Sequence, residues 1–465
     1  MKPQKHKCSS EYYADVGGDR LSEMPDEVIV HILSCMPTIV AVRTMLIRRF
    51  GNLWTLVHTL NFKVPEFLDI MAEGSTWSND VGRFNIFVHN VLKRHKRPFI
   101  NKFHLLLGCL YEHRREEAGD DIRMWLKFAF DKQAKNIYFC DVGSPFADSS
   151  DFPNFTSQSL VTLELWNCSV FPEFQVNLGS LKKLILCHTY MCEETLQQFI
   201  CGCPSLQELR IVEPTINKLR FSAPNIRKLS LVLIEHVFDD PWPLDFPNLK
   251  SLDLETNWIP DVIDVSSIRD VYLKQLYVNL RDENEHRRLN IFWEKFSRSE
   301  VFQLSLDASE QFLHSINDLN PLQIRWKRVV LGLRIFCQSC LLGVYHLMRS
   351  SKDLEELDIY TDTTLAYTSV CNTPSLFAGR VFKASADLPT VELSYPCVMP
   401  KLKIVTLHGY AKPWEHQLQL VEFLLKSATV LEKLVIYPNK HHKMDFVMHV
   451  SSFQRSSPSA RVLFL

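Results

Sequence analysis

Two stretches from the middle of the chain, residues 203–211 (CPSLQELRI) and 246–254 (FPNLKSLDL), share one arrangement of apolar residues. In both, the arrangement is apolar-x-x-apolar-x-apolar, and it begins at Leu206 in one stretch and at Leu249 in the other. Apolar residues two positions apart are typical of a short strand that buries one face. Regular recurrence of this pattern along the chain would indicate a fold built from repeats.

The pattern recurs along most of the chain at nearly constant spacing. Most steps between copies are 21 to 29 residues long, which is the period of leucine-rich repeats. One repeat cannot bury its apolar edge alone, so neighbouring repeats must stack into a continuous core. The sequence thus predicts an α/β solenoid of parallel strands with return helices or loops. Further copies begin at Ile100, Ala134, Leu160, Leu181, Leu273, Val301, Leu354, Leu402 and Leu431, and weaker copies at Arg328 and Ser459.

Two places depart from this period. The pattern also begins at Ile216 and Ile226, and steps of ten residues leave no room for a return helix, which predicts tight loops or a local hairpin. Residues 360–396 contain Thr, Ser and Pro and show no period, so they are predicted to form a surface insertion in the solenoid. This insertion is either a linker between subdomains or a loop that binds a partner.

The N-terminal part of the chain has a helical pattern instead. Residues 19–62 are DRLSEMPDEVIVHILSCMPTIVAVRTMLIRRFGNLWTLVHTLNF. Pro25 suits the first turn of a helix that Pro37 ends. A second helix is predicted from Ile39 with a bend near Arg48, and a short third turn follows. Three short helices close a small core poorly, so this module is expected to pack on a neighbouring domain, as a cap, or on a partner.

Residues 18–62 resemble a plant F-box, which implies docking on a Skp-type adaptor that links the chain to a cullin ubiquitin ligase. The chain departs from the family at Met24, where Leu is usual, and at residues 47–51, where Ile-Arg replaces Ser-Lys and Phe-Gly replaces Trp-Arg. The later changes bear on adaptor affinity more than on the fold. The matching residues are Asp19, Arg20, Leu21, Ser22, Pro25, Asp26, Glu27, Val28, Ile32, Leu33, Ser34, Pro37, Thr38, Ala41, Val42, Arg43, Thr44, Leu46, Arg49, Leu53 and Trp54. The resemblance implies adaptor contacts at Leu21, Met24, Pro25, Val28, Ile32, Leu33, Pro37, Val42, Leu46, Arg49, Leu53 and Trp54.

Two further resemblances cover the rest of the chain. The repeat phrases quoted above are similar to those that follow F-boxes in plant proteins, and they assign residues 63–396 to the solenoid. Residues 397–465 resemble the FBD domain, because LLKSATVLEKL stands where that family has LLKNAPVLEKM. The spacing of 29 residues from Leu402 to Leu431 equals one more repeat. This segment is therefore expected to form closing coils that cover the last apolar edge of the solenoid.

Composition and motifs exclude several classes of function. The 52 Lys and Arg against 53 Asp and Glu leave no broad basic face for nucleic acid. The sequence contains no glycine-rich phosphate loop and no catalytic motif, so neither an enzyme nor a cofactor is expected. Cys337 and Cys340 form a lone Cys-x-x-Cys without the second pair that structural zinc requires, so buried repeat cysteines are expected there and no metal. The basic run at residues 93–97 is interpreted as a solvated helix end, with a nuclear-import or phosphate-binding patch as the alternative.

The chain is expected to work in the cytoplasm, the nucleus or both. Its 13 scattered cysteines suit reduced thiols inside the cell. Residues 1–17 are predicted to be a disordered polar tail without the apolar core of a secretory signal. The longest uncharged apolar run, 14 residues at 335–348, is too short to span a bilayer.

The resemblance to plant F-box proteins implies a substrate receptor in which the F-box docks on the adaptor. The repeat face would hold a target protein near the ubiquitin-conjugating enzyme and so raise its effective concentration. One alternative is a small-molecule co-receptor, and another is an interaction scaffold that binds no adaptor. The candidate target-binding residues are polar positions around the strands, Lys182, Lys183, Gln207, Glu208, Lys250 and Asp253. A basic ligand site would use Arg210, Lys218, Arg220 and Arg227, among which Glu208 and Glu213 interleave.

Overall fold

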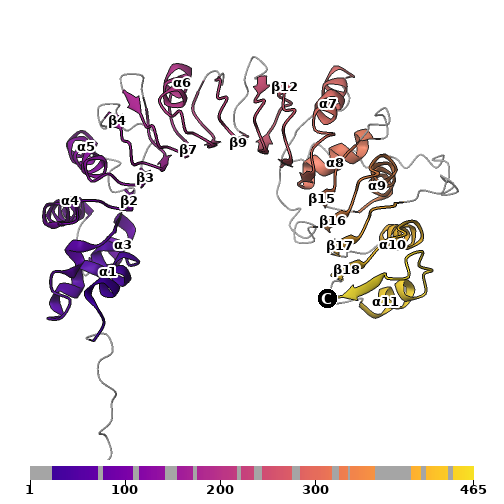
Figure 1. Cartoon of the computed structure of the whole chain (residues 1–465), viewed down its shortest axis with the longest axis horizontal. Helices are drawn as coiled ribbons and strands as arrows, with labels where there is room; N and C mark the ends of the chain where they lie inside the picture. Colours follow the sequence, from indigo (N-terminus) through magenta and orange to yellow (C-terminus); the bar gives the residue numbers. More distant parts are fainter. Residues whose placement is uncertain are drawn as a thin grey trace, which may run out of the picture. The chain divides into compact units, whose positions relative to one another are not determined.

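The computed structural model has a mixed α/β fold with parallel strands, as the repeat spacing predicts. It divides into two compact units, Met1–Leu181 (unit 1) and Lys182–Leu465 (unit 2). Within each unit the repeat strands lie on one side and the longer helices on the other (Figure 1). The structure describes residues 23–71, 77–107, 115–141, 154–170, 175–216, 221–234, 243–274, 283–316, 324–333, 336–361, 399–409, 415–437 and 443–465.

Unit 1 begins with a helical module and continues into a parallel sheet. The module contains α1 (Asp26–Ser34), α2 (Thr38–Arg43) and the 3-10 turns η1 (Thr44–Leu46) and η2 (Leu53–Leu56). The strands then pair in the order β1 (Thr59–Lys63), β2 (Lys102–Leu106), β3 (Asn136–Cys140) and β5 (Thr162–Trp166). Between them run α3 (Val64–Met71), α4 (Trp77–Arg94) and α5 (Arg115–Asp131), and β4 (Phe155–Thr156) pairs separately with β6 (Val176–Asn177).

The second helix of the module is shorter than predicted. It ends at Arg43, and after η1 the backbone at Ile47 is extended, with φ −89° and ψ 115°. The predicted bend of a continuing helix near Arg48 is therefore wrong. The Thr44 hydroxyl donates a hydrogen bond to the Ala41 carbonyl at 2.6 Å. Such local side-chain bonds to the backbone compete with the helical ladder.

The first repeat strand lies earlier in the chain than the pattern predicted. Val57, Leu60 and Phe62 occupy the three apolar positions of the pattern, and all three are buried. β1 pairs in parallel with β2, with Leu60 opposite Phe103. The helical module is thus followed at once by a strand of the sheet, without a linker between them.

Unit 2 continues the same alternation. Its described strands pair in the order β7 (Lys183–Cys187), β8 (Glu208–Val212), β9 (Lys228–Leu233), β11 (Ser251–Thr256), β13 (Asp270–Leu273), β14 (Val301–Leu304), β15 (Arg328–Leu333), β16 (Glu356–Thr361), β17 (Ile404–His408), β18 (Lys433–Tyr437) and β19 (Arg461–Phe464). The described helices are α6 (Glu193–Cys201), α7 (Glu283–Lys295), α8 (Leu306–Ser315), α9 (Gln338–Ser350), α10 (Glu415–Ser427) and α11 (Lys443–Ser451). A separate short pair joins β10 (Pro243–Asp245) to β12 (Asp261–Asp264).

The register of β13 differs from the prediction. The pattern was expected to begin at Leu273, but Leu273 is the last residue of the strand, and the buried set is Ile268, Val271 and Leu273. Around this strand apolar residues are dense enough for the six-residue pattern to fit two frames. Burial decides between the frames, and the sequence pattern alone does not.

The registers of β14 and β15 also begin two residues earlier than predicted. β14 buries Ser299, Phe302 and Leu304, so its pattern begins at a serine and not at Val301. The Ser299 hydroxyl donates to the Phe296 carbonyl at 2.9 Å, which allows a polar residue in an apolar position. In the next strand the buried residues are Trp326, Val329 and Leu331, not the set that begins at Arg328.

The two steps of ten residues, from Leu206 to Ile216 and from Ile216 to Ile226, together make one repeat, and this repeat contains no helix among the described residues. β8 pairs directly with β9, with Glu208 opposite Lys228. Ile226 leads into β9 as predicted, whereas Ile216 is buried beside an isolated bridge between Thr215 and Tyr190 and begins no strand of the main order. Ile216 therefore belongs to the connection and not to a strand of its own.

The C-terminal segment continues the repeats. β16 pairs with β17, β17 with β18 and β18 with β19, all in parallel. Residues 362–398, which include most of the predicted insertion, lie outside the described residues. The strands on either side of them are direct neighbours, with Glu356 opposite Ile404.

Candidate interaction surfaces

Arg49 holds the start of α1 against the end of the helical module. Its Nη1 lies 2.7 Å from Asp26 Oδ1, and its Nη2 donates to the Met24 carbonyl at 2.9 Å. Asp26 is also in the first turn of α1, where a carboxylate is favoured by the helix dipole. Arg49, a predicted adaptor contact, therefore has a structural role inside the module.

The predicted adaptor contacts differ widely in exposure. Leu33 and Trp54 are only 3% exposed each, so they lie in the interior of the module. Leu21 lies outside the described residues. The exposed contacts are Pro25, Val28 and Leu46, and the half-buried ones are Met24, Ile32, Pro37, Val42, Arg49 and Leu53.

Three consecutive apolar side chains at the end of the module face solvent. Leu46 is 85% exposed, and its neighbours Met45 and Ile47 are 45% and 50% exposed. Clustered exposed apolar residues mark interaction sites. Met45 and Ile47 were not among the predicted contacts, although Ile47 stands where the resembling family usually has Ser. This replacement of a polar by an apolar residue is the feature of the sequence that could have identified Ile47 as part of an interaction surface.

Hydrogen bonds fix this module to the first repeat strand. The Ser34 hydroxyl accepts from the His58 backbone N–H at 2.8 Å, and the Thr38 hydroxyl accepts from the Asn61 N–H at 2.6 Å. Ser34 and Thr38 are both buried. Buried side chains of the module thus bind it to the first strand of unit 1, and the exposed apolar residues lie at the end of this module.

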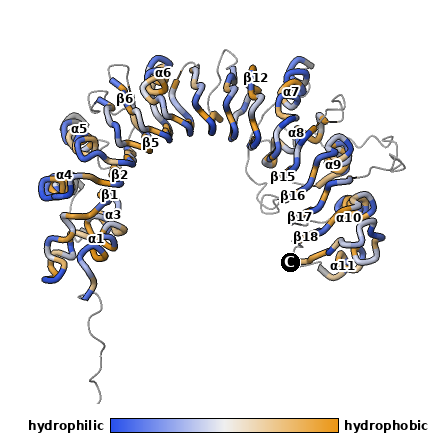
Figure 2. Tube along the Cα trace, in the orientation of Figure 1, coloured by the Kyte–Doolittle hydropathy of each residue, from blue (hydrophilic) through white to orange (hydrophobic). Residues whose placement is uncertain are grey.

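The sheet of unit 2 presents a second surface, because alternate strand residues point away from the helices. Figure 2 shows hydrophobic and hydrophilic residues alternating along the strands. In β11 the residues Leu252 and Leu254 are buried, while Ser251, Asp253 and Glu255 are half-buried on the other face. Repetition of this alternation over successive strands gives a mixed, polar sheet face.

The predicted target-binding residues divide between this face and its border. Lys183 and Glu208 lie on neighbouring strands and form an ion pair of 2.8 Å. Asp253 lies on the face as well. The other three, Lys182, Gln207 and Lys250, are exposed but directly precede their strands, and their backbone carbonyls accept bonds from the next repeat. The prediction did not distinguish these two kinds of position.

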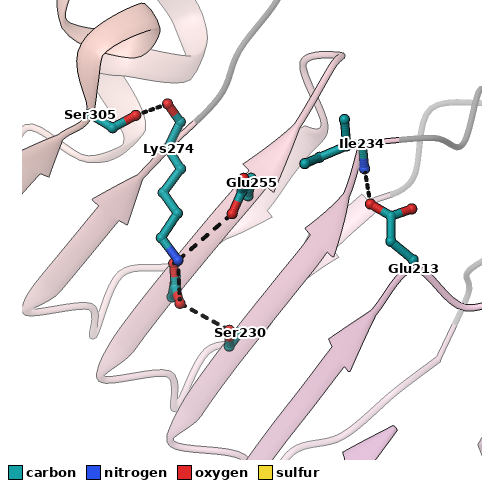
Figure 3. Close-up of polar contacts among 7 residues, drawn as sticks. Glu213, Ser230, Ile234, Glu255, Lys274 and Ser305 are labelled. Carbon is teal, nitrogen blue, oxygen red and sulfur yellow. Dashed lines mark hydrogen bonds and ion pairs between the residues drawn. The ribbon is translucent and has the colours of Figure 1, made fainter. Parts of the chain in front are cut away.

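Lys274 organises a charge cluster on the same face. Its Nζ lies 3.3 Å from Asp253 Oδ1 and 3.7 Å from Glu255 Oε2, and Ser230 donates to Asp253 at 3.0 Å (Figure 3). The same ammonium is 4.9 Å from the centre of the Tyr272 ring. Burial, and then the charges of Asp253 and Glu255, raise the pKa of the Tyr272 hydroxyl. One cation between two carboxylates leaves a net negative charge on this part of the sheet.

Unit 1 carries an aromatic row on its own sheet face. The His104 and Tyr138 ring centres are 4.0 Å apart, and the Tyr138 and Trp166 ring centres 6.1 Å. Burial, and then the charge of Lys63, lower the pKa of His104 from 6.5 to about 4. His104 is therefore neutral at pH 7 and contributes ring surface, not charge.

The basic run at the end of α4 is partly structural. His95 is buried, and its Nε2 lies 3.0 Å from the Val57 carbonyl. Lys96 donates its backbone N–H to Thr55, and Arg97 donates a side-chain N–H to Leu56. The run therefore joins α4 to the residues just before β1, while Lys93 and Arg94 are exposed as a solvated helix end predicts.

Two of the four basic residues of the alternative ligand site lie within the described residues. Arg210 is exposed on β8 and Arg227 is exposed just before β9, while Lys218 and Arg220 lie outside the described residues. Glu213 does not interleave on this face as a free charge, because it is 9% exposed and its Oε1 accepts the Ile234 N–H at 2.7 Å (Figure 3).

Among the described residues, no group of His, Cys, Asp and Glu is arranged to hold a metal ion. No helix in the described ranges is both long and apolar enough to cross a membrane.

Comparison with known proteins supports the repeat and C-terminal assignments. A family model described as the LRR repeats of an FBD-associated F-box protein matches residues 122–276, and the FBD model matches residues 394–436. The chain is 25% identical over 379 residues to an F-box/LRR-repeat protein of Arabidopsis thaliana, which covers 77% of this chain and 73% of that protein. It is 24% identical over 472 residues to an F-box/FBD/LRR-repeat protein of the same plant, which covers 96% of each. A further F-box/FBD/LRR-repeat protein is 28% identical over 267 residues, or 53% of this chain and 60% of that protein. The chain therefore contains leucine-rich repeats and an FBD domain and is related to the F-box/FBD/LRR-repeat proteins of plants.

Proposed function

We propose that this protein is the substrate-recognition subunit of a Skp–cullin–F-box ubiquitin ligase. The helical module docks on the Skp-type adaptor, and the repeat face of unit 2 holds the target protein. The chain supplies no catalytic group; it acts by holding the target close to the enzyme that carries ubiquitin, which raises the effective concentration of target lysines.

The observation that carries the proposal is the exposed apolar end of the module. Leu46 is 85% exposed between two further exposed apolar residues, although the module has a buried core of its own around Leu33 and Trp54. Covering a leucine side chain with a partner contributes about 1.5–3 kcal/mol. The related proteins carry F-box in their names, which supports the same role for this module.

Co-purification with a Skp-type adaptor tests the docking. Leu46→Asp places a charge in the interface without disturbing the module's core, so we expect it to abolish co-purification. Ile86→Asp is the matched control, because Ile86 is 64% exposed on α4, outside the module, and the same change there should leave adaptor binding intact. The docking proposal is wrong if wild type and both variants co-purify equally, or if wild type does not bind at all.

For the target, we propose that the polar sheet face of unit 2 and the exposed residues that border it make the contacts. Its mixed charges and half-buried polar side chains suit a wet and specific protein interface. Reversing the charges of Lys182, Lys183 and Lys250 together should abolish target capture while adaptor binding persists. If capture survives this change but is lost on deleting residues 362–388, the insertion is the binding element and the sheet face is not.

A further inference from the structure

Two cysteines meet at the start of α9. Cys337 is the N-cap residue of this 13-residue helix, and Cys340 lies in its first turn. Their Sγ atoms are 3.3 Å apart, within hydrogen-bond distance for sulfur. Cys337 is half-buried, whereas Cys340 is 1% exposed. A reagent therefore reaches Cys337 first, and Cys340 stands directly behind it.

The surroundings of Cys337 favour its thiolate. The hydrogen bond with Cys340 is the largest influence, and with bonds from Ser339 it lowers the pKa of Cys337 to about 4 against the opposing effect of burial. The Ser339 hydroxyl lies 3.0 Å from Cys337 Sγ. The positive end of the helix dipole acts in the same direction. The pKa of Cys340 is raised, because the hydrogen bond to Cys337 and burial both favour its protonated form.

The helix that carries the pair is rigidly seated. Gly343 of α9 packs so closely on α8 that a Cβ there would lie 2.5 Å from the Leu313 carbonyl oxygen. Tyr345 packs against Phe423 of α10, with ring centres 4.4 Å apart and ring planes tilted by 47°. This packing positions α9, and the two sulfurs at its start need to approach by little more than about 1 Å to reach the disulfide bond length.

We propose that Cys337 and Cys340 form a redox modification site, in which a hydroperoxide oxidises Cys337 and Cys340 then closes a disulfide. The Cys337 thiolate attacks the peroxide; one oxygen is transferred to sulfur, the O–O bond breaks, and with hydrogen peroxide the leaving hydroxide takes up a proton. The Cys340 thiol then attacks Cys337 Sγ, the S–O bond breaks, and water leaves. Overall two thiols and one hydrogen peroxide give one disulfide and two waters. A dithiol reductant reverses the reaction.

Unit 2 contains its own comparison site. Cys192 is the N-cap of α6, as Cys337 is of α9, but the residue three positions later is Thr195, whose hydroxyl lies 3.1 Å from Cys192 Sγ. Glu193 and Glu194 follow Cys192, where Gln338 and Ser339 follow Cys337. The Cys192 site has the helix start but lacks the second thiol, and two carboxylates directly follow its cysteine, whereas at the Cys337 site the charge of Glu310 on α8 acts on Cys340.

Peptide mass spectrometry of the full-length protein tests the proposal. After a limited dose of hydrogen peroxide and alkylation of the remaining thiols, we expect the peptide with Cys337 and Cys340 to have lost two hydrogens, while Cys192 and the exposed Cys201 are alkylated. Dithiothreitol should restore both thiols. The alkylation rate of Cys337 should be nearly constant from pH 6 to pH 8, where an ordinary thiol gains about tenfold per pH unit.

Two variants separate the thiol pair from a merely accessible cysteine. Cys340→Thr gives Cys337 the hydroxyl partner that Cys192 has but keeps Gln338 and Ser339 in place of the two glutamates. Cys337 should then still be oxidised, without disulfide formation, and its alkylation should become pH-dependent. Cys337→Ser keeps the buried thiol, and Cys340 should then resist peroxide. The proposal is overturned if Cys192 oxidises as readily as Cys337, if Cys340→Thr leaves the alkylation profile of Cys337 unchanged, or if wild type yields no disulfide at a dose that oxidises Cys201.

Discussion

Two buried tryptophans of unit 2 provide a matched test of how the repeat core is held together. Trp293 and Trp326 are both fully buried. Trp326 stacks on Phe302 with ring centres 4.0 Å apart, and its Nε1–H donates to the Phe296 carbonyl at 2.9 Å. Trp293 packs edge-on against Phe312, and its Nε1–H has no partner among the described residues. The same substitution, Trp to Phe, therefore removes a hydrogen-bonded indole N–H at one site and an unpaired indole N–H at the other.

The two variants should differ in their free energy of unfolding because only one of the two N–H groups has a hydrogen-bond partner within the part of the chain that the structure describes. Both variants lose packing and leave a cavity, and each should be destabilised on that account. Trp326→Phe additionally loses a hydrogen bond worth about 0.5–1.5 kcal/mol, while Trp293→Phe removes a buried unpaired donor whose desolvation costs about 1–3 kcal/mol. The two effects add, so we expect Trp326→Phe to lower the free energy of unfolding by about 1.5–4.5 kcal/mol more than Trp293→Phe.

Urea unfolding of the full-length variants, followed by far-ultraviolet circular dichroism, measures this difference. Circular dichroism is preferred because each substitution removes one of the nine tryptophans and so changes the fluorescence signal itself. A Trp293→Phe variant that is destabilised as much as Trp326→Phe, or more, would refute the reasoning that hydrogen-bond satisfaction and not ring volume separates the two sites.

The remaining predictions concern pH, the C-terminal repeats and the charge cluster. The folded-state pKa of His104 is lowered from 6.5 to about 4, so between these values the unfolded chain binds a proton at His104 and the folded chain does not. The contribution of His104 to folding stability is therefore full above pH 6.5 and is lost as the pH falls towards 4. His104→Gln should thus reduce the difference in melting temperature between pH 7 and pH 5. Removing residues 397–465 uncovers the edge of β16, so the shortened chain should aggregate or melt at lower temperature; a monomer with an undiminished transition would mean that the FBD domain is dispensable for the fold. Lys274→Met removes the cation that Asp253 and Glu255 share, so chemical denaturation at pH 7 should show a loss of about 0.2–1 kcal/mol per broken ion pair, and high salt should diminish that loss; a loss unaffected by salt would mean that Lys274 acts through packing.

The sequence predicted the repeats well where the apolar positions are Leu, Ile or Phe and the frame is unique. At Leu160, Leu181, Leu206 and Leu249 the predicted inward residues are the buried ones. Prediction failed at Ser299, because a polar residue can occupy an inward position when a backbone carbonyl satisfies it. It also failed at Leu273, because two frames contain equally apolar residues and only the stacking of neighbouring repeats selects one.

The candidate surfaces were less predictable than the fold. A motif identifies which residues resemble a docking module, but it does not separate the interior from the surface, so Leu33 and Trp54 were grouped with Leu46. The Lys274 cluster unites residues from β9, β11 and the end of β13, which are separated by tens of residues in the sequence. Their register across the sheet, and not their spacing, brings them together.

The proposed function requires that one chain joins an adaptor to a target through two separate surfaces. Proximity labelling in cells with the cullin inhibited, followed by measurement of ubiquitin on the labelled proteins after the inhibitor is removed, tests it most directly. We expect a set of proteins that is labelled by wild type and by Leu46→Asp but not by the variant with the charges of Lys182, Lys183 and Lys250 reversed. That set should be ubiquitinated only with wild type. Ubiquitination of that set at equal levels with wild type and Leu46→Asp, or the same labelled set with all three proteins, would contradict it.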